Sequence, residues 1–129
     1  MKTGMHVALA GCLIAMLSTS ASSQGPGLSR VMREKLDHSK AILGAVVTSD
    51  WAALDRESRA LARAARDPAW LSLTSPEYLK QSDAFERALK DMAEASAKRD
   101  LEAASKAEVA LTISCVECHR YVARQRVAR

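Results

Sequence analysis

Helix-breaking residues are scarce in this chain of 129 residues, which contains three prolines and five glycines. Because these residues mark turns and interrupt helices, their scarcity gives little support to a fold rich in loops. No segment shows the alternation of apolar and polar residues that is typical of strands. With an apolar content of 48 %, much of it alanine, the composition predicts one small all-α domain.

Cysteine is also rare, with three residues, of which Cys12 lies in an N-terminal leader. The two that remain, Cys115 and Cys118, are too few for a disulfide framework. The net charge is small, +4 from 19 basic and 15 acidic residues, and therefore gives little support to nucleic-acid binding.

The N-terminus carries the pattern of a secretory signal peptide over residues 1–23. Lys2 precedes an apolar run over residues 7–17, and small polar residues follow that run. The run is shorter than the roughly 20 apolar residues that a bilayer-spanning helix needs. We therefore expect export to the periplasm, cleavage shortly before Gln24, and a mature domain over residues 24–129.

The leader leaves two alternatives open. Cys12 ends the segment Leu-Ala-Gly-Cys, which resembles the lipobox of bacterial lipoproteins and would give a lipid anchor if it were used. An uncleaved leader would instead hold the protein at the membrane. Either anchor would change the location of the protein without changing the domain that follows.

The most informative segment is Cys115-Val116-Glu117-Cys118-His119, the attachment signature of a c-type haem. Two thiols one helical turn apart can each add to a vinyl group on the same edge of a porphyrin. His119 then lies where its imidazole can reach the iron from one face. We therefore expect one covalent haem c on Cys115 and Cys118, with His119 as an axial iron ligand.

Three other chemistries use paired cysteines. A thioredoxin-like pair lies at a helix N-terminus within a βαβ unit, whereas this motif lies deep inside a predicted helix. A structural zinc site needs four ligands, so His38 would have to join Cys115, Cys118 and His119 from far away in the sequence. A disulfide between the two cysteines is the third alternative.

Apolar periodicity predicts four helices, which span residues 28–48, 51–66, 76–98 and 101–126. Capping residues precede three of them: Ser49 or Asp50 the second, Ser75 with Pro76 the third, and Asp100 the fourth. Short connections within the first and the last pair predict an antiparallel four-helix bundle, in which the first and last helices lie side by side.

The first predicted helix has an apolar arc that we expect to face the interior. Its members are Leu28, Val31, Met32, Leu36, Ile42, Leu43, Val46 and Val47. In the second helix a three-four spacing places the inward residues, which are Trp51, Leu54, Ser58, Leu61 and Ala65. In the third helix we expect burial of Tyr78, Phe85, Leu89 and Met92.

With its leader, four helices and a haem motif on the last helix, the chain resembles a class II cytochrome c, that is, the cytochrome c′ family and its low-spin relatives. The resemblance covers the whole mature chain, and its specific element is the motif near the C-terminus. The chain departs from many members after the histidine, where Tyr121 follows by two residues and Arg124 by five. The resemblance implies haem on the last helix inside an antiparallel bundle, and a homodimer is common in the family.

The function depends on the sixth position of the iron. After the leader, the strong ligands besides His119 are Met32, His38 and Met92. Met32 lies near the centre of the inward arc, and the low-spin relatives imply an axial methionine at about this place. We therefore expect Met32 to be the second axial ligand, with Met92, His38 and an open iron as the alternatives.

Ligation by His119 and Met32 would saturate the iron and raise its reduction potential, so the protein would carry single electrons between redox partner proteins. An open, five-coordinate iron would instead bind a small gas such as nitric oxide or carbon monoxide. The sequence places no second histidine or carboxylate cluster beside the haem, so we expect a carrier and not an enzyme.

Arginines gather in the last ten residues of the chain, at Arg120, Arg124, Arg126 and Arg129. Cations at the C-terminal end of a helix interact favourably with its dipole, and this is the simplest interpretation. A partner for haem carboxylates and a docking patch for an acidic redox partner are the alternatives.

Overall fold

The computed structural model describes residues 26–71 and 74–127. The predicted signal peptide over residues 1–23, with Cys12 in it, and the predicted mature start near Gln24 lie outside the described residues.

The described chain is all-helical, with four helices and no strand. The helices are α1 (Pro26–Thr48), α2 (Trp51–Ala64), α3 (Pro76–Lys98) and α4 (Leu101–Val127). These bounds lie within two residues of those that the periodicity predicts. Among the described helices, none combines the length and apolarity that a membrane crossing requires.

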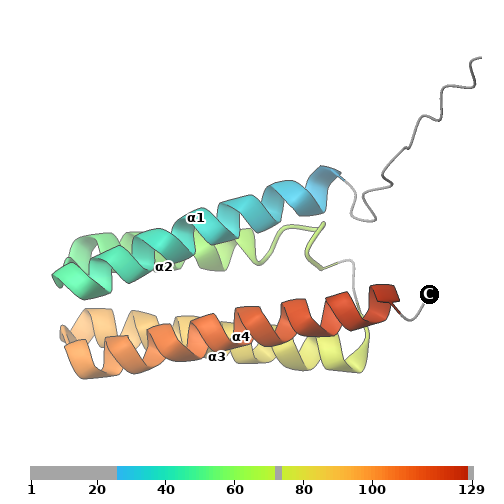
Figure 1. Ribbon diagram of the computed structural model, residues 1–129. Coiled ribbons are helices and arrows are strands. Elements are labelled where there is room, and N and C mark those ends of the chain that lie inside the picture. The colour runs from blue at the N-terminus through green and yellow to red at the C-terminus, as the bar shows by residue number, and fades with distance from the viewer. Residues whose placement is uncertain (1–25, 72–73, 128–129) are drawn as a thin grey trace, which may run out of the picture.

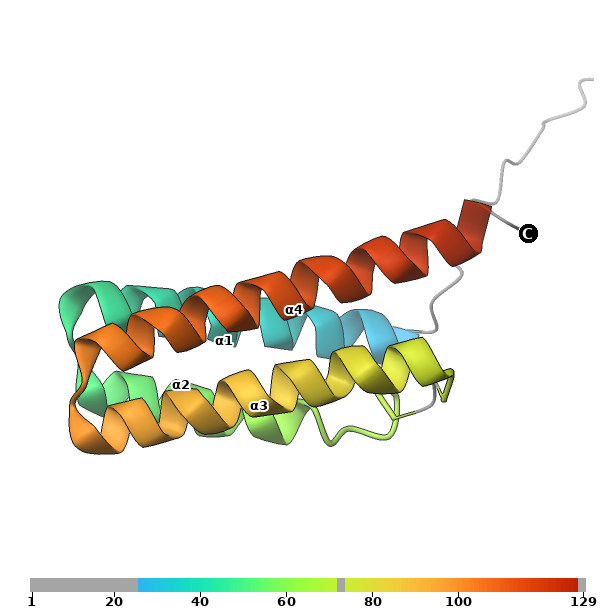
Figure 2. The ribbon, with the colours of Figure 1, turned by 90° about the horizontal axis from the view of Figure 1, so that it is seen from below.

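The four helices lie lengthwise at the corners of a bundle (Figures 1 and 2). Helix α1 packs beside α2, and α3 packs beside α4; α2 also contacts α3, and α1 also contacts α4. The start of α1, the connection between α2 and α3, and the end of α4 lie at the same end of the molecule (Figure 1). Residues early in α1 and late in α4 therefore come close together there.

Side-chain caps explain where three helices begin. Asp50 Oδ1 accepts a hydrogen bond from the Ala53 amide, and Asp100 Oδ1 accepts one from the Ala103 amide, each at 3.0 Å. Ser75 Oγ accepts one from the Tyr78 amide at 3.3 Å. Such caps satisfy backbone amides that have no partner within the helix, and each typically contributes about 1 kcal/mol.

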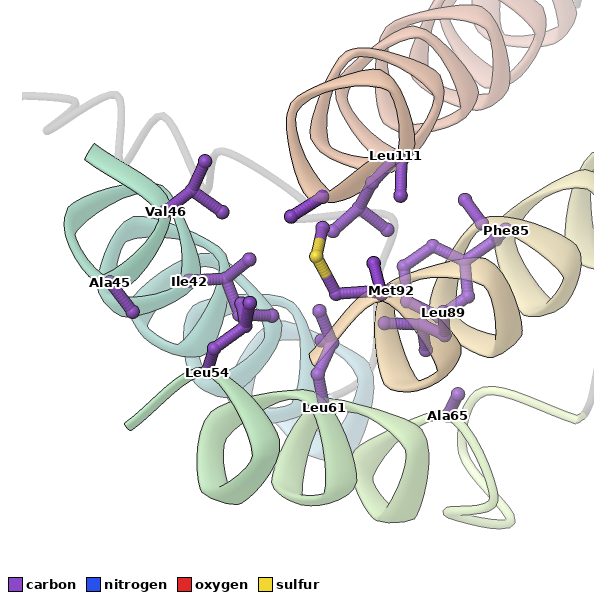
Figure 3. Packing of buried hydrophobic residues seen from close by; sticks show 14 residues of the cluster. Ile42, Ala45, Val46, Leu54, Leu61, Ala65, Phe85, Leu89, Met92 and Leu111 are labelled. Carbon is purple, nitrogen blue, oxygen red and sulfur yellow. The ribbon is translucent and has the colours of Figure 1, made fainter. Parts of the chain in front are cut away.

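The main core lies between all four helices. Met92 extends from α3 to the centre of this core, where the labelled side chains of Ile42, Leu61 and Leu111 surround it (Figure 3). Met92 and Ile42 have no exposed surface, and Leu111 is 1 % exposed. Burial of one such side chain stabilises the fold by roughly 1.5–3 kcal/mol.

The inward arc predicted for the second and third helices is buried as expected, apart from Trp51, which is half-buried. The arc predicted for the first helix is partly wrong, because Leu36, Leu43 and Val47 are 57 %, 50 % and 75 % exposed. Helix α1 packs mainly against α2, and its side toward α4 is only partly covered. The apolar arc is therefore wider than the buried face of the helix.

Candidate functional site

The paired cysteines lie in the second half of α4, one helical turn apart, on the side of the helix that faces the interior. Cys118 is 8 % exposed and Cys115 is half-buried, and neither forms a disulfide. Cys115 packs against the main core, whereas Cys118 belongs to a second buried cluster with Val31, Trp70 and Tyr78. The two thiols therefore face inward near the end of the bundle.

A pocket of about 220 Å³ opens beside these cysteines. Cys115, Cys118 and His119 line it from α4, and Met32 lines it from α1. Its other walls are Lys35, Leu36, Ser39, Trp70, Gln81, Phe85, Leu111, Thr112, Ser114 and Val116. One pocket therefore brings together the residues that the sequence predicts to hold a haem, which are Cys115, Cys118, His119 and Met32.

A smaller cavity of about 30 Å³ lies next to the first. Met32, Trp70, Cys118 and His119 line both cavities. Met32 and His119 therefore reach the same space from two different helices, α1 and α4. The start of α1 and the end of α4 lie at the same end of the molecule, which accounts for this (Figure 1).

The rim of the pocket is apolar and exposed. Leu36 from α1 is 57 % exposed and Val116 from α4 is 50 % exposed, and both line the pocket. Apolar side chains that flank a pocket in this way favour occupation by an apolar group that covers them. A flat, largely apolar group attached to Cys115 and Cys118 would cover both.

Burial raises the pKa of both thiols, of Cys115 and of Cys118, above the ordinary value. Reactive dithiols of the thioredoxin type have the opposite property, because a helix N-terminus or a nearby cation lowers their pKa. Cys115 and Cys118 lie 14 and 17 residues beyond Leu101, where α4 begins. The environment of the pair therefore favours an attachment role over thiol–disulfide exchange.

His38 and Met92 lie elsewhere. His38 is half-buried on α1, and its Nδ1 lies 2.8 Å from Glu57 Oε2 on α2. Met92 is enclosed in the main core. Neither residue lines either of the two cavities that contain His119.

The zinc alternative requires four ligands in one place. Within residues 26–71 and 74–127, no three side chains of the types His, Cys, Asp or Glu are grouped so that they could share a metal ion. The set of His38, Cys115, Cys118 and His119 is therefore not assembled in the structure.

Sequence reasoning did not find several residues of the pocket wall. Trp70 lies in the connection between α2 and α3, where no helical periodicity points to it. It packs against Tyr78, whose hydroxyl donates a hydrogen bond to the Trp70 carbonyl oxygen at 2.7 Å.

Outside the pocket wall, the Tyr121 hydroxyl shares a hydrogen bond of 3.0 Å with Ser75 Oγ. Tyr121 thus connects the end of α4 to the start of α3.

The arginines at the C-terminus are only partly described. Arg120 forms an exposed ion pair with Glu117 at 2.8 Å, one turn earlier in α4. Arg124 is exposed, the side chain of Arg126 is not among those described, and Arg129 lies outside the described residues. The described pair fits the interpretation of a solvated helix end.

Glu108 is a buried carboxyl group two turns before Cys115 on α4, and it is 9 % exposed. Thr112 Oγ1 donates to Glu108 Oε1 at 3.4 Å, while Oε2 is buried and lacks a hydrogen-bond partner among the described residues. Burial raises the pKa of Glu108, so the folded chain keeps a proton that the unfolded chain has lost. Stability must then fall as pH rises above the unfolded pKa of about 4.3.

We predict that Glu108→Gln raises the free energy of unfolding at pH 7 by about 1 kcal/mol, because the neutral amide needs neither a buried charge nor the uptake of a proton on folding. Urea unfolding of the variant and the wild type at pH 7 and near pH 4 measures this. The gain should shrink toward pH 4, where most of the wild-type carboxyl is protonated in the unfolded state as well as in the folded state. Glu94→Gln, at an exposed position of α3, is the control. An equal gain in the free energy of unfolding at both pH values would contradict a raised pKa of Glu108.

Comparison of the chain with models of known protein families, with curated proteins and with solved structures gives no significant match.

Proposed function

We propose that this protein is an exported c-type cytochrome that carries one covalent haem on Cys115 and Cys118. The observation that supports this most strongly is the pocket in which these two cysteines, His119 and Met32 meet. The residues fit a haem, because the thiols face a space with an apolar rim and an imidazole lies beside them. When bound, the haem would supply a one-electron couple at its iron.

In this proposal the architecture is an antiparallel four-helix bundle with the haem on its last helix. His119 from α4 and Met32 from α1 would hold the iron. The placement of Met32 beside His119 in both cavities supports this assignment, as does the position of His38 at Glu57 and of Met92 in the core. Sulfur and imidazole together favour the reduced state of an iron centre and close it to further ligands.

The biochemical role that follows is electron transfer in the periplasm, without catalysis. The protein would accept one electron from a reduced partner protein and pass it to an oxidised partner protein. The exposed side chains of Leu36 and Val116 line the pocket, and a partner could approach a haem held there from this side.

The test is the optical spectrum of the reduced protein before and after addition of carbon monoxide. A saturated iron should give a low-spin spectrum that carbon monoxide leaves unchanged. Rapid carbon monoxide binding and a high-spin reduced spectrum would contradict electron transfer through a saturated haem. The gas-binding alternative, with an open iron, would then take its place.

A further inference from the structure

Lys35 is a buried cation in the same pocket. Lys35 lies on α1, one turn after Met32, and 7 % of the residue's surface is exposed. The ammonium Nζ lies 3.1 Å from the centroid of the Trp70 ring and 3.8 Å from that of Phe85. Lys35 therefore extends into the pocket between α1, α3 and the connection that carries Trp70.

No carboxylate among the described residues of the pocket wall pairs with this ammonium. None of the described residues that line the pocket is an aspartate or a glutamate. Contacts with aromatic faces are worth roughly 0.5–2 kcal/mol, less than the several kcal/mol that burial of an ion costs. In agreement, burial lowers the pKa of Lys35 to about 8, although the neighbouring Cys115 and Cys118 act to raise it.

A charge in this position acts on any redox centre that the cysteines hold. Lys35 lines the same pocket as Cys115 and Cys118, so it lies near the point of attachment. Lys35 itself is 7 % exposed and its ammonium lies against two aromatic rings, so its field is less screened than that of a surface lysine. Reduction of an iron adds one negative charge, which a nearby cation stabilises.

We infer that Lys35 is a potential-setting residue, whose buried positive charge beside Cys115 and Cys118 raises the reduction potential of the haem. This inference rests on the proposed function, since it requires the covalent haem. It adds a second cause of a high potential, independent of sulfur ligation by Met32. Lys35 does not touch the iron in this role, and it acts through space.

The size of the effect follows from Coulomb's law. A unit charge at about 12 Å, with an effective dielectric constant of about 20, changes the equilibrium constant for reduction by about tenfold. For a one-electron couple, tenfold corresponds to about 59 mV. An exposed charge at a similar separation is screened by water and salt and has a much smaller effect.

The experiment is a spectroscopic redox titration of the holoprotein at pH 6.5 with four variants. Lys35→Met and Lys35→Gln remove the charge and keep an unbranched side chain of similar length over Trp70 and Phe85. Lys35→Arg keeps the charge. Lys40→Met is the matched control, because Lys40 lies on the same helix with a side chain that is 63 % exposed.

We expect both neutral Lys35 variants to lower the equilibrium constant for reduction about tenfold, with Lys35→Arg and Lys40→Met within threefold of the wild type. The ligand-field bands should stay unchanged throughout. Equal potentials in Lys35→Met, Lys35→Gln and Lys40→Met would overturn the inference while leaving the proposed function intact. Altered axial-ligand bands in Lys35→Arg would also overturn it, since Lys35 would then act at the iron. A wild type without covalent haem would instead refute the proposed function.

Discussion

Replacement of His119 by alanine is expected to abolish normal haem ligation while the thioether bonds to Cys115 and Cys118 still form. The physical reason is that, in the proposed cytochrome, attachment and ligation would use different residues of the same α4 segment, all of which line the pocket. The optical spectrum of the purified variant should lose the low-spin bands, and its intact mass should still include the haem. This is the largest spectroscopic change that we expect from one substitution.

The control for this experiment is His38→Ala. His38 pairs with Glu57 between α1 and α2 and does not line the pocket. Its removal should leave the spectrum unchanged and affect only stability. An unchanged ligand-field spectrum in His119→Ala would contradict the role of this residue, and a lost low-spin spectrum in His38→Ala would transfer that role to His38.

Met32→Ala should open the iron on the side of α1. A methionine sulfur ligand gives a weak charge-transfer band near the red edge of the visible spectrum, and this band should disappear. The reduction potential should fall, because thioether sulfur favours the reduced iron. Carbon monoxide should then bind to the reduced variant, as absorbance spectroscopy can show directly.

Met92→Ala separates ligation from packing. Met92 has no exposed surface and lies in the main core, so its truncation should destabilise the fold by about 2–5 kcal/mol. The spectrum, the potential and the response to carbon monoxide should stay as in the wild type. A charge-transfer band that survives Met32→Ala and vanishes in Met92→Ala would contradict the assignment of the sixth ligand.

The helices could be predicted from the sequence because their limits have local causes. Asp50, Ser75 and Asp100 accept hydrogen bonds from amides three residues later, and each of these caps is readable from residue type and position. The buried face of α3 could also be predicted, since that helix packs against two neighbours and buries its apolar stripe.

The walls of the pocket could be predicted only in part. The cysteine–histidine motif and Met32 can be picked out from the sequence, because few residue types are able to bind an iron. Lys35 cannot be picked out in this way, because a lysine is expected at the surface. Its burial depends on Trp70 and Phe85, which come from elsewhere in the chain. Conversely Leu36 was expected inside, and it is exposed because α1 and α4 are only loosely covered beside the pocket. Periodicity predicts which face of a helix is apolar. It does not predict how closely two helices pack, and this decides which apolar residues are buried.

The most direct test of the central claim is the intact mass of the mature protein, made in a bacterium whose periplasm contains haem-attachment machinery. The mass should equal that of the chain from near Gln24 plus one haem, and the haem should remain with the polypeptide through denaturation and extraction with acidic acetone. A start at Cys12 with added acyl mass would place the same cytochrome on a lipid anchor. A colourless protein that carries no haem and binds zinc through Cys115 and Cys118 would contradict the claim.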